Sequence, residues 1–244
     1  MTSGASHDFF ATTRWTMVLK AGSESAGIAD RDVQAALEEL CRIYWFPLYA
    51  YARRRNYAKA DAEDLTQGFF AQLLQRKDFS RLQAERGRFR AFLLASLKHY
   101  LANEYDRAHR LKRGGTIMPL SLDYEGAAAK FEVADKTASP DEIFDREWAL
   151  ALLEYVLERL RHEWMERGQT ELFEALKIFL TVEKSTANYD AVATQLGVSE
   201  GSLRVAAHRL RKRYRELLKD EISQTLAEPG MVDEELRTLL GVFG

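Results

Sequence analysis

Two aspartates three residues apart, Asp61 and Asp64, have a type and spacing that could do chemistry. Paired carboxylates can bind a metal ion or act as a general acid and base. Both fall at the start of a predicted helix, where negative charge also stabilises the helix dipole, and no His or Cys lies within reach in the sequence. We therefore expect neither a metal site nor a catalytic role for this pair.

The other catalytic patterns in the sequence are incomplete. His162 and Glu163 begin a run similar to the zinc-binding helix of metalloproteases, but the second His is missing. A single cysteine, Cys41, excludes an internal disulfide framework and a multi-cysteine zinc site, and its helical surroundings indicate burial. Three serines lack the context of a nucleophile elbow: Ser96, Ser121 and Ser202. The sequence predicts a protein that is not an enzyme and binds no metal or cofactor.

Two segments carry a strong positive charge that the overall net charge of −2 hides. Residues 86–115 hold eight basic and two acidic side chains, and residues 199–219 hold seven basic and two acidic ones. Residues 121–147 and 220–240 are acidic, each with a net charge of −5. Separate basic patches are typical of two contacts with a polyanion, and solvated helix faces are the plainer interpretation.

The elements that must position these residues are predicted to be helices. Apolar residues recur at three- and four-residue spacing and strand-like alternation is nearly absent, so the sequence predicts an all-α protein. The run 114–140, with paired Gly and two Pro, breaks the pattern and is interpreted as a flexible linker. It separates two small helical domains, 1–113 and 141–222, and an acidic extension follows at 223–244. The first expected helix contains Trp15, Val18 and Leu19 and is capped by Thr12 or Thr13. The others cover 29–55, 59–76, 87–110, 141–167, 170–182, 189–196, 200–221 and 232–240.

The chain lacks the sequence features of export and membrane insertion. No apolar run approaches the roughly 18 residues that a membrane span needs, and the first ten residues lack the basic-then-apolar order of a signal peptide. We therefore expect a cytoplasmic protein without membrane contact.

Residues 190–215 carry the most specific local pattern. Gly197 allows a sharp turn between two helices, and Ser199 can cap the second one. That second helix has an apolar face and a basic face, as in a helix-turn-helix, whose second helix enters the major groove of DNA. The side chains from Ser202 to His208 are placed for base edges and the later ones for phosphates. The residues expected to contact duplex DNA are Ser199, Ser202, Arg204, Val205, His208, Arg209, Arg211, Lys212 and Arg215.

The order of motifs along the chain resembles a known family. An acidic helix with the sequence DAEDLTQ starts at residue 61, and a basic aromatic segment with the sequence GRFRAF starts at residue 87. A linker and a terminal helix-turn-helix follow. From about residue 12 to 222 the chain is similar to the extracytoplasmic-function sigma factors, the two-domain sigma subunits of bacterial RNA polymerase. The resemblance implies a protein that binds core polymerase, recognises the −10 and −35 promoter elements and promotes transcription initiation.

The resemblance also implies which residues serve each contact. In the family the acidic helix docks on the clamp of the largest polymerase subunit, and the matching residues are Asp61, Asp64, Gln67 and Phe70. The next segment binds the single-stranded −10 element, and the matching side chains are Phe79, Arg86, Arg88, Phe89, Arg90, Lys98, His99, Tyr100, Asn103 and Arg107. A basic groove with aromatic planes suits this role, because unstacked bases need a surface on which to stack. Core packing is the alternative interpretation of Phe89, Phe92, Leu93 and Leu97, and for Phe92 and Leu97 it is the preferred one. The helix-turn-helix matches the domain that reads the −35 element as duplex.

Regulation and an alternative function complete the expectations. Family members are often held by an anti-sigma protein or controlled by a kinase, and Thr66 in the acidic helix is a candidate for phosphorylation. The acidic extension is additional to the family pattern, and its charge suggests that it folds back on a basic surface and weakens DNA binding. The alternative function is a stand-alone helix-turn-helix regulator that does not bind core polymerase, which leaves the acidic helix without a role.

Overall fold

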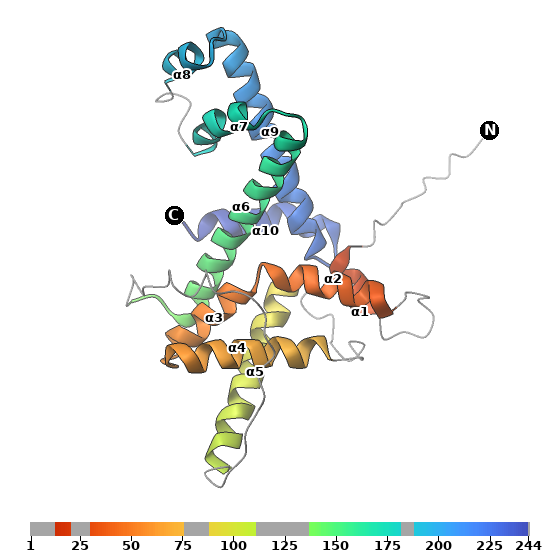
Figure 1. The fold of residues 1–244 in the computed structure, drawn as a ribbon. Coiled ribbons are helices and arrows are strands. Elements are labelled where there is room, and N and C mark those ends of the chain that lie inside the picture. Colours follow the sequence, from red (N-terminus) through yellow and green to blue (C-terminus); the bar gives the residue numbers. More distant parts are fainter. Residues whose placement is uncertain (1–12, 21–29, 76–87, 111–136, 182–187, 244) are drawn as a thin grey trace, which may run out of the picture.

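A computed structural model describes residues 13–20, 30–75, 88–110, 137–181 and 188–243 of the chain. Within these ranges the protein is all-α, as predicted, without a strand apart from one isolated bridge. None of the described helices combines the length and the apolar character needed to cross a membrane. The helices, arranged as in Figure 1, are α1 (Arg14–Lys20), α2 (Asp30–Arg42), α3 (Trp45–Arg54), α4 (Lys59–Leu74), α5 (Phe89–Arg110), α6 (Pro140–Glu166), α7 (Thr170–Leu176), η2 (Lys177–Leu180), α8 (Tyr189–Leu196), α9 (Glu200–Gln224), η3 (Pro229–Met231) and α10 (Val232–Gly241).

Residues 30–54 form two helices where the sequence predicts a single one. α2 ends at Arg42 and α3 begins at Trp45. The prediction is wrong because of Pro47, which has no N–H to donate to the Ile43 carbonyl and whose ring would collide with that carbonyl in a continuous helix. Because a new helix starts at Trp45, Pro47 falls in its first turn. The N–H groups of a first turn have no partner within the helix, so proline costs no hydrogen bond there.

The long helix α6 begins where the sequence indicates. Ser139 Oγ accepts a hydrogen bond from the backbone N–H of Glu142 at 3.2 Å, and the Glu142 carboxylate accepts one from the backbone N–H of Ser139 at 2.7 Å. This capping box, with Pro140 at the first helical position, satisfies amide groups that the helix itself cannot. Gly168 follows the other end at φ +69°, so both predicted boundaries of this helix are confirmed to within a residue.

The helices share one hydrophobic core. α6 packs along α3, and α9 packs on α6 (Figure 1). The core contains Phe144, Trp148 and Leu152 of α6 as well as Leu48 and Tyr49 of α3. The segments predicted as two domains therefore contact each other extensively, although their division into two domains stays a prediction. Most of the predicted linker lies outside the described residues.

The first helix and the end of α9 are held together by hydrogen bonds. The Glu221 carboxylate of α9 is almost completely buried between two guanidinium groups, those of Arg14 and Arg159. Thr13 Oγ1 donates to the Leu226 carbonyl at 2.9 Å. Because a buried carboxylate is stable only with such partners, these contacts fix α1, α6 and α9 relative to one another.

Candidate nucleic-acid interface

The turn between α8 and α9 is short and well capped. Gly197 ends α8 in the left-handed region at φ +65°, which a residue without a side chain adopts freely. Ser199 Oγ then accepts a hydrogen bond from the backbone N–H of Ser202 at 3.2 Å and caps α9. The roles predicted for Gly197 and Ser199 are confirmed, and together they set the direction in which α9 leaves α8.

α9 has one buried face and one exposed face. Leu203, Ala207 and Leu210 are buried where α9 packs against α7, η2 and α8. The opposite face is open to solvent over the first half of the helix. Eight of the nine residues predicted to contact duplex DNA are exposed: Ser199, Ser202, Arg204, Val205, His208, Arg209, Lys212 and Arg215.

Arg211 is the exception, because its guanidinium group is used within the protein. Its Nε donates to the Phe179 carbonyl at 2.8 Å, and its Nη2 donates to the Tyr189 hydroxyl at 3.0 Å. Arg211 therefore joins α9 to η2 and α8. Arg204 lies over the Tyr189 ring, 4.5 Å from its centroid, and donates to Glu200, yet more than half of its side chain stays exposed.

The acidic helix α4 presents only part of its predicted contact set to solvent. Asp61 and Asp64 are exposed and form no ion pair with another described residue, and Gln67 is half-buried. Phe70 is buried in the core, so it is not available to a protein partner in this conformation. Thr66 is also fully buried, with its hydroxyl bonded inside the helix, so a kinase cannot reach it in this conformation.

Phe89, predicted to stack on a base, belongs to the hydrophobic core. Its ring is fully buried, with its centroid 5.0 Å from the ring of Trp15 and 5.2 Å from the ring of Tyr44. The side chain is therefore not available to single-stranded DNA in this conformation. Phe79 and Arg86, from the same predicted set, lie outside the described residues.

The basic residues at the start of α5 pair with acidic residues of α10. Arg90 Nε donates to Glu235 Oε1 at 3.0 Å, and Arg88 Nη2 donates to Glu234 Oε1 at 2.6 Å. Arg88 Nε also lies 3.3 Å from Glu235 Oε2. Burial opposes the charge of Arg90, but the Glu235 and Asp145 carboxylates outweigh it and raise the pKa of Arg90. Both guanidinium groups are already bound by carboxylates of the same chain.

α6 supplies two more carboxylates to the same helix. Asp145 pairs with Arg90, whose guanidinium group also lies over the Trp148 ring, 4.6 Å from the centroid. Burial raises the pKa of Asp145, and the positive charge of Arg90 partly opposes that rise. Farther along α5, Lys98 Nζ donates to Asp141 Oδ2 at 2.7 Å. Three of the predicted single-strand contacts are therefore occupied by acids of the same chain.

The second half of α5 is more open. Tyr100 is half-buried, with its ring centroid 5.8 Å from that of Phe69, and burial raises the pKa of its hydroxyl to about 12. A Cβ atom at Gly68 would overlap the Tyr100 hydroxyl, so the glycine permits the close approach of α5 to α4. Three other residues of the predicted set are exposed here: His99, Asn103 and Arg107.

Individual partners of the α5 cations are not evident from the sequence. The available signal is the net charge of −5 in each of the segments 121–147 and 220–240, which contain all four acids involved. The expectation that the acidic extension folds back on a basic surface is confirmed by the α10 ion pairs. Its effect on DNA binding stays a prediction.

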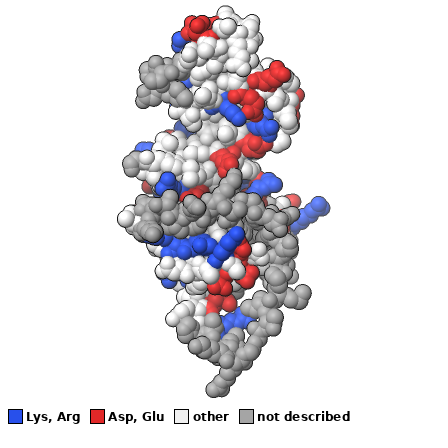
Figure 2. Space-filling model, turned by 60° about the vertical axis from the view of Figure 1, so that its left-hand side comes forward, with Lys and Arg blue, Asp and Glu red and all other residues white. Residues whose placement is uncertain are grey.

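One face of the protein carries both signs of charge rather than one continuous field. Figure 2 shows one face, on which Lys and Arg side chains lie next to Asp and Glu side chains over most of its height. Interspersed charges of this kind favour local contacts over long-range attraction of a polyanion. A nucleic-acid contact therefore has to be assigned to particular exposed faces.

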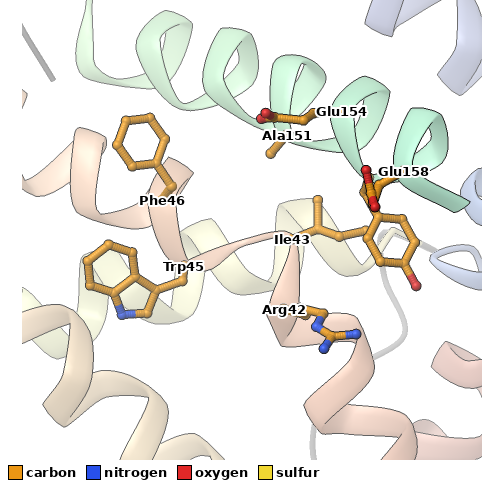
Figure 3. Close-up of a pocket in the computed structure, with 8 residues that line it drawn as sticks. Arg42, Ile43, Trp45, Phe46, Ala151, Glu154 and Glu158 are labelled. Carbon is orange, nitrogen blue, oxygen red and sulfur yellow. The ribbon is translucent and has the colours of Figure 1, made fainter. Parts of the chain in front are cut away.

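A hollow of about 250 Å³ lies between the α2–α3 junction and α6. Figure 3 shows Ile43 and Phe46 on one side facing Ala151, Glu154 and Glu158 of α6 on the other. The lining combines apolar side chains with Arg42, Tyr155 and two glutamates, and it contains no serine, cysteine or lysine. Among the described residues, no three His, Cys, Asp or Glu side chains are grouped so that they could hold a metal ion.

Comparisons with known proteins add no assignment. The chain matches no protein-family model, no curated protein and no solved structure. The candidate interfaces therefore rest on the residues and their geometry.

Proposed function

We propose that this chain is a sigma-type subunit of bacterial RNA polymerase, which binds core polymerase, recognises the −10 and −35 promoter elements and promotes transcription initiation without catalysis of its own. The observation that carries the proposal is the presence of two different exposed faces in one chain. α4 presents Asp61 and Asp64, and α9 presents a row of cations beside a capped turn. Figure 1 shows α4 and the N-terminal half of α9 in opposite parts of the molecule, which leaves room for a polymerase and duplex DNA to be bound together.

We assign duplex recognition to α8 and α9, acting as a helix-turn-helix. The major groove of B-DNA admits an α-helix, and the buried row of Leu203, Ala207 and Leu210 leaves the opposite face of α9 free to enter it. In this assignment Arg204 and His208 reach base edges, because they lie in the first turns of the helix. The phosphate contacts are Arg209, Lys212 and Arg215. Arg211 supports the fold of the domain instead of binding DNA.

We assign polymerase docking to the exposed acids of α4 and single-strand binding to α5. The docking assignment is supported by the exposure of Asp61 and Asp64, which form no ion pair with another described residue. On α5, the exposed His99, Asn103 and Arg107 are available at once. Arg88, Arg90 and Lys98 join them when their carboxylate partners move away.

A stand-alone helix-turn-helix regulator is the second candidate. The observation that favours it is the pairing of the α5 cations within the chain, which leaves α9 as the open basic face. Binding to purified core polymerase separates the two functions. In size-exclusion chromatography we expect the chain to form a stoichiometric complex with core polymerase, and that complex should give run-off transcripts from specific genomic fragments. A chain that binds duplex DNA but never core polymerase would support the regulator.

A further inference from the structure

We propose that the C-terminal segment, Thr225–Phe243, is an intramolecular competitor that covers the cationic start of α5 and keeps it from single-stranded DNA. This inference rests on the proposed function, which assigns α5 to the melted strand. It concerns how the start of α5 is blocked while the duplex-binding face of α9 stays exposed.

The C-terminal segment is hydrogen-bonded to Phe89, the first residue of α5. The backbone N–H of Phe89 donates to the Thr225 carbonyl at 2.9 Å, and Arg88 forms an isolated antiparallel bridge with Leu226. Leu226 and Leu239 of the segment are fully buried. The backbone contacts at Phe89 and Arg88 hold the segment at the start of α5 by more than charge attraction, and α10 itself packs on α9 and α6.

The carboxylates of α10 occupy the donors that a phosphate would need. Glu235 is 1% exposed and lies between Arg88 and Arg90, and Glu234 takes a further donor of Arg88. Carboxylate and phosphate bind the same planar array of guanidinium N–H groups, so the two ligands are mutually exclusive at these arginines. A DNA phosphate can reach Arg90, itself only 12% exposed, once α10 has moved.

α6 adds two acids along α5, Asp145 and Asp141, which pair with Arg90 and Lys98, and the Lys98 side chain stays 43% exposed. From Arg88 to Lys98 the cations span about 15 Å of helix at 1.5 Å per residue, and each of the three faces an acid of the same chain. On α9, by contrast, the assigned DNA contacts do not pair with the C-terminal segment. Arg209 and Arg215 form no ion pair with another described residue, while Arg204 and Lys212 pair with glutamates of α9 itself. The competitor therefore acts on one nucleic-acid surface and not on the other.

The test compares two double variants of the full chain that remove the same charge from the same segment. Glu234→Gln with Glu235→Gln removes the acids that face α5. The matched control is Glu228→Gln with Asp233→Asn, which removes two acids that do not face α5. Glu228 is exposed, and Asp233 pairs with Lys219 of α9. Binding is measured by fluorescence anisotropy with a labelled single-stranded oligonucleotide of mixed sequence and with the same strand annealed to its complement.

We expect the first variant to bind the single strand at least about fivefold more tightly than the unmodified chain, because a larger fraction of molecules is binding-competent. The control should stay within about twofold, and the two variants should bind the duplex alike. Equal tightening in both variants, or none in the first, overturns the inference. If circular dichroism shows that the first variant is unfolded, Glu234→Gln alone replaces it, since that carboxylate is 57% exposed; it should tighten binding in the same direction, and no change overturns the inference.

The same variants distinguish this inference from the function on which it rests. Each is mixed with core polymerase and examined for complex formation. If core binding is retained while single-strand affinity does not change, the competitor is refuted and the proposed function stands. If neither the unmodified chain nor any variant binds core polymerase, the proposed function fails, whatever the anisotropy shows.

Discussion

Glu235 and Arg90 lie 145 positions apart in the chain, yet Glu235 Oε1 accepts a hydrogen bond from Arg90 Nε at 3.0 Å and both side chains are largely buried. The pair ties α10, the last helix, to the first turn of α5. The same arginine contacts Asp145 and the ring of Trp148, so α6 closes the site from another side. A residue that the sequence assigns to DNA contact is thus also part of the protein interior.

This double role predicts a stability effect of removing Arg90. We expect Arg90→Ala to lower the free energy of unfolding by about 3 kcal/mol, because Glu235 and Asp145 lose a buried partner and only Arg88 remains near Glu235. Urea unfolding followed by circular dichroism measures the change. The control is Arg107→Ala, whose exposed pairing with Glu104 should be worth less than about 1 kcal/mol. Equal effects of the two substitutions would show that the Arg90 site contributes no more than a surface ion pair.

Charge reversal on α4 is predicted to abolish polymerase binding. Asp61→Arg with Asp64→Arg replaces two exposed acids, so the fold and the melting temperature should change little while core binding falls by more than about tenfold. Surface plasmon resonance with immobilised core polymerase gives the affinity. Glu166→Arg with Glu171→Arg is the matched control, because both residues are exposed and the net charge changes equally. The docking assignment fails if both double variants bind core alike.

Two neighbouring arginines of α9 are predicted to behave differently. Arg209→Ala should weaken duplex binding and reduce its salt dependence without changing stability, because Arg209 is exposed. Arg211→Ala should instead lower the free energy of unfolding by about 1–2 kcal/mol, since the Phe179 carbonyl and the Tyr189 hydroxyl lose their donor. Anisotropy titrations at several salt concentrations and urea unfolding are measured for both. A reversed pattern would contradict the division between DNA contact and structural support.

Helix positions were largely predictable because they depend on local patterns. The Ser139–Pro140 start of α6 and the Gly197 turn before α9 each follow from residues within a few positions of one another. Phe89 was misplaced on the surface although a local signal was present. With Leu93 and Leu97 it recurs at four-residue spacing, and all three are fully buried. The basic neighbours of Phe89 favoured the DNA interpretation over this periodicity.

The partners of buried charges could not be predicted in the same way. Hydrophobic periodicity shows which face of a helix is covered but not which distant segment covers it. The pairing of Glu221 with Arg14 depends on how the end of α9 returns to α1, and the pairing of Glu235 with Arg90 depends on how α10 returns to the start of α5. The net charge of each segment indicates that acidic and basic parts of the chain attract each other. It does not indicate which residues pair.

The lone thiol gives a test of the packed core. Cys41 is buried in α2, and burial together with the negative charge of Glu38 raises the pKa of its thiol well above the usual range. We expect the native protein to resist alkylation by iodoacetamide at neutral pH and to react fully in urea, because only the exposed thiolate is nucleophilic. Mass spectrometry after timed labelling measures this. Rapid labelling without denaturant would show that α2 opens readily.

The contact between α6 and α9 predicts a pH dependence of stability. Arg213 donates to both carboxylate oxygens of Glu163, at 2.9 and 2.6 Å, and these hydrogen bonds lower the pKa of Glu163 below its ordinary value of 4.5. Because the folded state holds the charged carboxylate, its stabilising effect is complete above pH 4.5 and is lost as the pH falls through the lowered pKa. Glu163→Gln should therefore be less stable than the unmodified chain by about 0.5–1 kcal/mol near neutral pH, a modest amount because the pair is partly exposed. The difference should shrink as the pH falls below 4.5 and through the lowered pKa of Glu163. Thermal melts from neutral to acidic pH measure this stability difference, and Glu166→Gln is the exposed control. A difference that stays constant with pH would show that Glu163 is not the titrating group.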